Sequence, residues 1–315
     1  MSTVTDTPTR AAWLRDDALL TLDDVHCAFK TASGRVHAVR GVTFDVRPGE
    51  TLGLVGESGC GKTTTGRAIL RLPGPTSGTV SFRGEDMESL SSGRMRAARR
   101  KLQMIFQDPL SAFNPRRKVV DIVGEGLDIQ GVPRSERTDR IAAALEQVGM
   151  SLAAVGDRRP HELSGGQCQR ISIARALAVG PDLIVCDEPV ASLDVSVQAR
   201  VLNVLQEIRE RNGLSLVFVS HDLAVVKVMS DRVAVMYRGR IVEIGPADSV
   251  YRTPLHPYTR RLLDAVPVID PAERVWTGAD DAEDDWRTVD RALVERAPGH
   301  FAALGEIVHD GEQVP

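Results

Sequence analysis

A glycine-rich turn between an apolar run and a helical segment limits what this chain can fold into. Residues 56–64 read GESGCGKTT, directly after the apolar run 51–55. In the spacing G-x-x-x-x-G-K-T, glycines let several backbone N–H groups point at one phosphate chain, and the following helix adds its positive N-terminus. We expect Lys62 to reach the β- and γ-phosphates and the Thr63 hydroxyl to ligate Mg²⁺. The turn therefore predicts a nucleoside triphosphate site formed by Gly56, Glu57, Ser58, Gly59, Cys60, Gly61, Lys62, Thr63 and Thr64.

A second glycine-containing turn, LSGGQ at residues 163–167, precedes a segment with helical periodicity at 168–179. Glycines and a serine before a helix form another anion-binding N-terminus. Two such turns in one chain favour a sandwich in which each nucleotide lies between two subunits. Here the sequence resembles the ATP-binding cassette (ABC) family, whose signature is this same LSGGQ. The resemblance implies that the residues contacting ATP on the opposing subunit are Ser164, Gly165, Gly166 and Gln167.

Two acids follow a short apolar run at residues 183–186. Such a run predicts a buried parallel strand that brings Asp187 and Glu188 to its carboxyl end, where open α/β sheets bind ligands. We expect Asp187 to hold Mg²⁺ through its water shell, which is the usual role of this aspartate in phosphate-loop enzymes. Glu188 is placed to polarise the attacking water.

The resemblance assigns three more segments in the order found in ABC proteins. Residues 192–194, SLD, match the D-loop at the dimer interface. His221, after a predicted strand at 214–219, matches the switch histidine that senses the γ-phosphate. Gln107 matches the Q-loop glutamine, which contacts Mg²⁺ and couples the nucleotide to the transport partner. Phe29 is our candidate for the aromatic residue that stacks on adenine, with a core position in its strand as the alternative.

Composition and charge exclude several other classes. The net charge of −4 over 315 residues provides no basic field for nucleic acid, and 4% aromatic content leaves little for base stacking. The basic residues at 94–101 are expected on a solvated helix face. Segment 1–17 lacks the apolar core of a signal peptide, and no apolar run approaches the ~18 residues of a membrane span. We therefore expect any membrane channel to be formed by other chains.

The predicted elements give an α/β fold: a phosphate-loop NTPase core of ABC type with an antiparallel β-subdomain, an inserted helical subdomain and a short C-terminal extension. We expect a loose N-terminal extension at 1–18 with Trp13 and Leu14 as its anchors. The nucleotide-binding domain is predicted at 19–250, its helical subdomain at about 110–179, and the extension at 251–315. Strands are predicted at 19–29, 36–46, 51–55, 183–187, 214–219, 231–236 and 240–244, and helices at 119–130, 136–148 and 168–179.

Other segments narrow the resemblance to one subfamily. FQDPLSAFNPR at 106–116, CDEPVASLDVSVQ at 186–198, PLHPYT at 254–259 with Val266-Pro267, and PGHF at 298–301 are similar to oligopeptide/dipeptide importers. The chain lacks the long heptad segment of chromosome-maintenance ATPases and the cysteine zinc modules of excision-repair ATPases. In physical terms, the segment 254–263 is predicted to be a helix that is interrupted by proline and packs on the core. The acidic residues at 280–285 are expected in a solvated loop.

The resemblance thus implies the ATPase subunit of an importer for peptides or a related solute such as nickel or a glycoside. Its implied location is the cytoplasmic face of the inner membrane. Its implied partners are two integral-membrane permease subunits, a second ATPase subunit, identical or similar, and, indirectly, a solute-binding protein. The alternative is a non-transport ABC ATPase that clamps nucleic acid or the ribosome.

The cysteines add three expectations. Cys168 stands where the family usually has a polar residue after LSGGQ, and no cysteine follows Cys186, so no iron–sulfur cluster is expected. Cys60 lies near a helix N-terminus, which lowers a thiol pKa, although its simpler role is a small residue that fits the turn.

Overall fold

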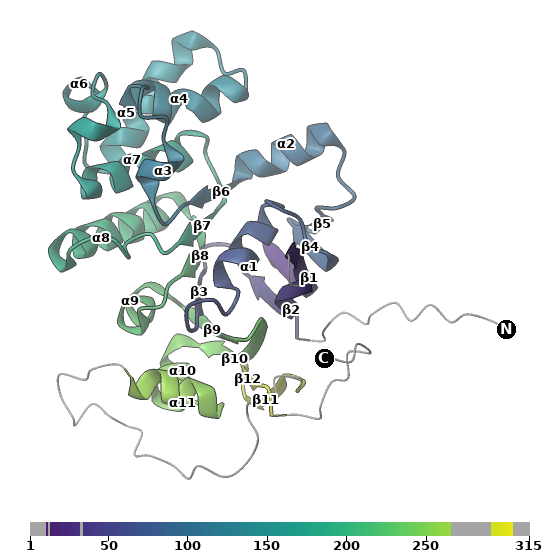
Figure 1. The fold of residues 1–315 in the computed structure, drawn as a ribbon. Coiled ribbons are helices and arrows are strands. Elements are labelled where there is room, and N and C mark those ends of the chain that lie inside the picture. Colours follow the sequence, from purple (N-terminus) through teal and green to yellow (C-terminus); the bar gives the residue numbers. More distant parts are fainter. Residues whose placement is uncertain (1–10, 12, 32–33, 266–290, 305–315) are drawn as a thin grey trace.

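A mixed sheet with a parallel centre forms the core of the protein. The computed structural model describes residues 11, 13–31, 34–265 and 291–304 (Figure 1). Within them, eight strands pair in the order β11-β12-β10-β9-β3-β8-β7-β6. The neighbours from β9 to β6 are parallel, whereas β10, β12 and β11 are antiparallel additions. The strands are β3 (Thr51–Val55), β6 (Leu102–Ile105), β7 (Leu183–Asp187), β8 (Ser215–Val219), β9 (Arg232–Tyr237), β10 (Arg240–Pro246), β11 (Val294–Ala297) and β12 (His300–Ala302).

A second, antiparallel sheet packs against the same core. Its described strands have the order β2-β1-β4-β5. Helix α1 (Lys62–Ile69) contacts strands of both sheets, so the turn before α1 lies where the two sheets meet. The strands are β1 (Leu20–Thr31), β2 (Gly34–Val46), β4 (Ser77–Phe82) and β5 (Glu85–Asp86).

Alternation of side chains along the central strands gives the core sheet two apolar faces. On β7, Leu183 and Val185 belong to the cluster shared with the antiparallel sheet. Ile184 and Cys186 belong to the cluster that includes the helices α4 (Val119–Ile129), α5 (Arg134–Gln147) and α7 (Gly165–Ala178). All four side chains are fully buried, as expected for a parallel strand covered on both faces.

The helices between β6 and β7 form a separate group above the sheets in Figure 1. In this group α7 packs on α4 and α5. Helix α2 has no buried residue, which agrees with the solvated face expected for its basic side chains. The remaining described helices are α2 (Ser92–Lys101), α3 (Pro109–Ala112), α4 (Val119–Ile129), α5 (Arg134–Gln147), α6 (Leu152–Val155), the 3₁₀ turn η1 (Pro160–Glu162), α7 (Gly165–Ala178), α8 (Val195–Asn212), α9 (Leu223–Met229), α10 (Ala247–Arg252) and α11 (Pro257–Asp264).

The elements predicted with bounds agree with the structure to within about three residues, but β4, β5, β6, β11 and β12 are not among those strands. The C-terminal strands continue the core sheet through β10, so residues 300–302 are part of the same sheet as β3, the strand that precedes the glycine-rich turn. Near the N-terminus, Leu14 is buried and the Trp13 ring lies 5.2 Å from that of Phe301. The predictions for 1–10, Val266-Pro267 and 280–285 fall outside the described residues. Among the described helices, none has both the length and the apolar composition to cross a membrane.

Candidate nucleotide site

The glycine-rich turn connects the end of β3 to the start of α1. Gly56, Gly59 and Gly61 have φ angles of 152°, 80° and 110°, values that other residues rarely adopt. A Cβ atom on Gly61 would lie 2.3 Å from the Ala38 carbonyl oxygen, and one on Gly56 would lie 2.1 Å from that of Met236. The turn is therefore wedged between β2 and β9, and both glycines are required by the backbone that surrounds them.

Lys62 begins α1, and its ammonium group folds back over the turn. Nζ donates to the carbonyl oxygens of Gly56 at 2.7 Å and Glu57 at 2.9 Å. The side chain is buried in spite of its charge. The positive N-terminal end of α1 begins at the same residue. Helix end and cation together make this turn suited to an anion.

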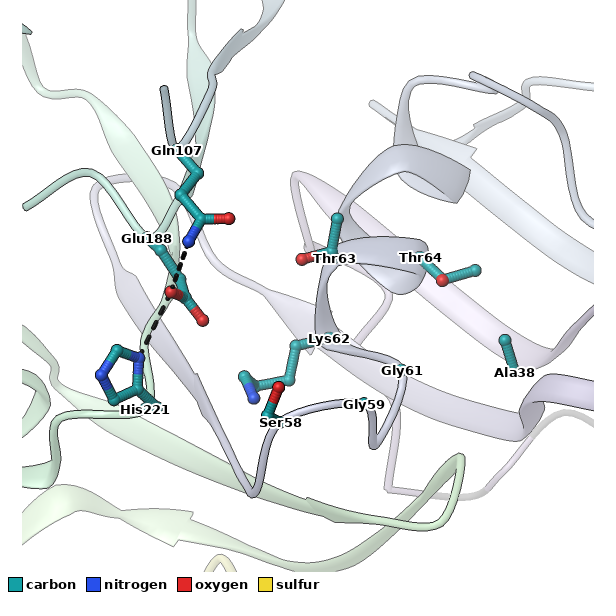
Figure 2. Close-up of a pocket in the computed structure, with 10 residues that line it drawn as sticks. All are labelled: Ala38, Ser58, Gly59, Gly61, Lys62, Thr63, Thr64, Gln107, Glu188 and His221. Atoms are coloured by element: carbon teal, nitrogen blue, oxygen red, sulfur yellow. Dashed lines mark hydrogen bonds and ion pairs between the residues drawn. The ribbon is translucent and has the colours of Figure 1, made fainter. Parts of the chain in front are cut away.

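A cavity of about 390 Å³ lies beside the turn. Figure 2 shows the turn and the start of α1 on one side, and Gln107, Glu188 and His221 on the other. These three residues follow β6, β7 and β8, whose carboxyl ends meet at one edge of the sheet. The cavity is also lined by Ala38, Ser58, Gly59, Gly61, Lys62, Thr63 and Thr64.

Glu188 is the centre of the second group. Its Oε2 atom accepts from Gln107 Nε2 at 3.1 Å and lies 3.3 Å from His221 Nδ1. The Glu188 side chain is 16% exposed, whereas that of His221 is 59% exposed. Glu188 has a φ of 46°, a left-handed conformation that costs about 1–3 kcal/mol for a non-glycine residue and is concentrated at functional sites. Its backbone N–H donates to Val219 at 3.0 Å, which keeps this residue at the sheet edge.

Asp187, the last residue of β7, faces the start of α1. Its Oδ1 atom accepts from the Thr63 hydroxyl at 2.8 Å. Burial raises the pKa of the Asp187 carboxyl group, and the hydrogen bond from Thr63 opposes this rise. A carboxylate and a hydroxyl at hydrogen-bond distance are oxygen ligands of the kind that Mg²⁺ prefers.

The LSGGQ turn begins helix α7, away from the residues that line this cavity. Ser164 and Gln167 form a capping box: Ser164 N–H donates to Gln167 Oε1 at 2.9 Å, and Gln167 N–H donates to Ser164 Oγ at 3.3 Å. A Cβ on Gly166 would lie 2.3 Å from Val197 Cγ1 on α8, and one on Gly165 would lie 3.6 Å from Leu193 Cδ2, next to Asp194, which caps α8. The signature turn and the D-loop are therefore in close contact within one chain.

Comparison with known proteins identifies the family. The family model described as ABC transporter matches residues 39–191, and the one described as oligopeptide/dipeptide transporter, C-terminal region, matches residues 242–288. The oligopeptide transport ATP-binding protein OppF of Bacillus subtilis (strain 168) is 50% identical over 258 residues, which cover 81% of this chain and 84% of that protein. The chain belongs to the ABC transporter family of ATPases.

Other relatives of this ABC ATPase support the same family and fold. OppF of Escherichia coli (strain K12) is 49% identical over 264 residues, 80% of this chain and 79% of that protein. The solved structure of cbiO1 from Clostridium perfringens, part of the ABC transporter complex cbiONQ, matches with a TM-score of 0.67 and 26% identity over 76% of this chain and 92% of that one. The dimeric cassette MJ0796 bound to ADP and Pi matches with a TM-score of 0.66 and 27% identity over 72% of this chain and 98% of that one. The predicted family and fold class are confirmed.

Phe29, Cys60 and Cys168 of this ABC ATPase lie in surroundings that bear on their expected roles. Phe29 is 37% exposed at the end of β1 and does not line the cavity. Burial raises the pKa of the Cys60 thiol, because desolvation outweighs the nearby Lys62; the lowered pKa expected from the helix end is wrong, and the simpler role of a small residue that fits the turn is favoured. Cys168 is fully buried with Sγ 3.6 Å from the Pro160 carbonyl oxygen, which explains a small apolar residue at this position.

Two arginines near Asp187 were missed by sequence reasoning. Arg67 and Arg175 line a second cavity of about 450 Å³ with Gln107 and Asp187. Arg175, on α7, donates to the Ala112 carbonyl oxygen at 3.3 Å and so joins the signature helix to the segment after Gln107. Neither arginine belongs to a motif of fixed spacing. The contact between Arg175 and Ala112 depends on how α7 packs against α3, which no sequence pattern indicates.

Proposed function

We propose that this chain is the ATP-hydrolysing subunit of an ABC importer for oligopeptides or dipeptides. The observation that carries the proposal is the match of residues 242–288 to the C-terminal region of oligopeptide/dipeptide transporters. Relatives at 49–50% identity named as oligopeptide transport ATP-binding proteins support it. These names favour transport over the alternative of a nucleic-acid or ribosome clamp.

In this proposal the glycine-rich turn binds the phosphates of ATP. Lys62 neutralises the β- and γ-phosphates, and the amides of residues 58–64 with the N-terminus of α1 complete the anion site. Thr63, Asp187 and Gln107 supply oxygen ligands, directly or through water, for a Mg²⁺ ion that would neutralise developing phosphate charge. The hydroxyl–carboxylate contact at 2.8 Å supports this donor set. Phe29 remains the proposed adenine contact.

Glu188 is the proposed base that polarises the attacking water. Its carboxylate is the common partner of Gln107 and His221, so a water in the cavity can be oriented by all three side chains. His221 would contact the γ-phosphate and report its presence. The left-handed backbone at Glu188 supports the assignment, because strained geometry is retained where function requires it.

The signature turn is proposed to act on the nucleotide of a second subunit. Ser164, Gly165, Gly166 and Gln167 do not line the cavity of their own chain, and a structural relative is a dimeric cassette. The second subunit can be identical or a paralogue. Residues 192–194 would lie at the interface between the two subunits.

The proposed assembly places this subunit peripherally on the cytoplasmic face of the inner membrane. Two integral-membrane permease subunits would form the channel, and a solute-binding protein outside would deliver the peptide. ATP binding would close the two cassettes and move the permeases through the segments around Gln107. Hydrolysis would then reopen the dimer.

Purification through a tag on this chain tests the proposal. We expect two hydrophobic permease subunits and a second cassette to be recovered, and the complex in proteoliposomes to take up a radiolabelled tripeptide with ATP. A complex carrying Lys62→Ala is the matched control and should not import. Recovery of ribosomes or DNA would support the clamp instead. Uptake of nickel or a glycoside but no peptide would show that the transported solute is not a peptide.

A further inference from the structure

A tyrosine near the C-terminus contacts the phosphate loop directly. The backbone N–H of Glu57, the second residue of the glycine-rich turn, donates to the Tyr258 hydroxyl at 3.0 Å. The two residues are 201 positions apart in sequence. Tyr258 is the second residue of α11 and is only 2% exposed. The contact therefore joins the family-specific C-terminal region to the nucleotide site.

The position of the Tyr258 hydroxyl is well determined by its surroundings. Its ring packs on Tyr237 with centroids 4.4 Å apart and planes at 40°. Tyr237 ends β9, one residue after Met236, whose carbonyl oxygen lies against Gly56. Burial raises the pKa of Tyr258, so the hydroxyl stays protonated and neutral. The aromatic pair thus fixes the acceptor next to the turn.

Helix α11 is itself held by a buried carboxylate. Glu243 on β10 is fully buried and accepts the backbone N–H of Leu255 at 2.9 Å and of His256 at 2.8 Å. The same carboxylate contacts His300 Nε2, on β12, at 2.7 Å. His256 then caps α11, because its Nδ1 accepts from the Tyr258 N–H at 3.1 Å. Hydrogen bonds thus run without a break from the sheet to the tyrosine.

The peptide group that joins Gly56 to Glu57 is held on both sides. Its carbonyl oxygen, which belongs to Gly56, accepts from Lys62 Nζ at 2.7 Å. With the N–H directed at Tyr258, this carbonyl points toward the lysine that is proposed to bind phosphate. Loss of the Tyr258 acceptor would free the peptide to rotate and would leave its N–H without this partner.

We propose that Tyr258 is a positioning residue of the nucleotide site, and that α11 preorganises the phosphate loop through it. The inference rests on the proposed binding of ATP at this loop. It gives the C-terminal region of this chain a direct effect on nucleotide affinity. A preorganised loop binds with less ordering cost, so the effect is expected in ATP affinity more than in turnover at saturation.

Tyr258→Phe tests this proposal, because it removes the hydroxyl and keeps the ring on Tyr237. We expect the Kd for MgATP, measured by titration calorimetry, to rise about 5- to 10-fold, as for the loss of one hydrogen bond. Turnover at saturating ATP should change less than the Kd. Tyr251→Phe is the matched control, because the Tyr251 hydroxyl donates to the Leu223 carbonyl oxygen, away from the phosphate loop. The Kd of this variant for MgATP should match that of the parent.

Amide hydrogen exchange gives a second readout in the full chain. In the parent, the Glu57 amide should be more protected than that of Gly59, and Tyr258→Phe should remove this difference while the Leu255 and His256 amides stay protected. An unchanged Kd in Tyr258→Phe overturns the proposal, as does an unprotected Glu57 amide in the parent. A parent chain that fails to bind MgATP would instead contradict the proposed function.

Discussion

The buried histidine that caps α11 makes a quantitative prediction about pH. His256 is 2% exposed, and burial lowers its pKa to about 4. Glu243 opposes this shift, whereas Arg291 and Arg260 reinforce it. The Nδ1 atom must stay unprotonated to accept from the Tyr258 N–H. Protonation of His256 would therefore remove the cap of α11 as well as place a charge in a buried site.

The sign and size of the effect follow from linkage. An unfolded histidine has a pKa of about 6.5, so between about pH 6.5 and pH 4 the unfolded chain binds more protons than the folded chain. The stability that neutral His256 provides is complete above about pH 6.5 and is lost as the pH falls toward 4. Between about pH 7.5 and pH 5, the lost free energy of unfolding is about 2 kcal/mol.

Urea unfolding followed by circular dichroism at the two pH values measures this loss. His256→Asn is the control variant, since asparagine offers a capping oxygen to the same N–H and does not titrate. The fall in unfolding free energy on acidification should be smaller in His256→Asn by about 2 kcal/mol. Equal falls in both proteins would refute the proposed role of His256 in the pH dependence.

Three further substitutions test the site. Lys62→Ala should weaken ATP binding about 10- to 100-fold, because a charged contact to phosphate is lost, and near-normal ATPase activity would refute the phosphate-loop assignment. His221→Ala should bind ATP within about twofold of the parent but hydrolyse it about 100-fold more slowly, and parent-like turnover would remove this partner of Glu188 from the mechanism. Gly166→Ala should destabilise the chain by about 1–3 kcal/mol in thermal unfolding, because the added Cβ would lie 2.3 Å from Val197 Cγ1. Adding Val197→Ala should restore part of this loss. An unchanged stability in Gly166→Ala would contradict this packing.

The parts of the site that sequence predicted are those whose chemistry requires a fixed spacing. Gly56, Gly61 and Lys62 lie in one short turn, and the turn needs its glycines for backbone reasons that the structure confirms. Asp187 and Glu188 end a run that reads as a buried strand, so their place at the sheet edge followed from the fold class. Gln107 and His221 depended on the family resemblance, because neither residue has a local pattern of its own.

Features that depend on packing between distant segments could not be predicted from the sequence. The Tyr258–Glu57 contact joins residues far apart in sequence, and the pattern around Tyr258 indicates only a helix start. The pKa of Cys60 is raised because the turn is buried between two strands, which a local helix-end argument omits. The short strands β4 and β5 are stabilised by pairing with β1 and with each other rather than by their own composition.

The most direct test of the central claim is the oligomeric state of Glu188→Gln with MgATP. Glutamine keeps the size of Glu188 but removes the charge proposed to activate water, while Lys62, Thr63 and Asp187 still bind nucleotide. Sedimentation of this variant, with its partner cassette where one is required, should show an ATP-dependent dimer that retains unhydrolysed ATP, whereas the parent should turn ATP over. A variant that stays monomeric with ATP, or that hydrolyses ATP at the parent rate, would contradict the account.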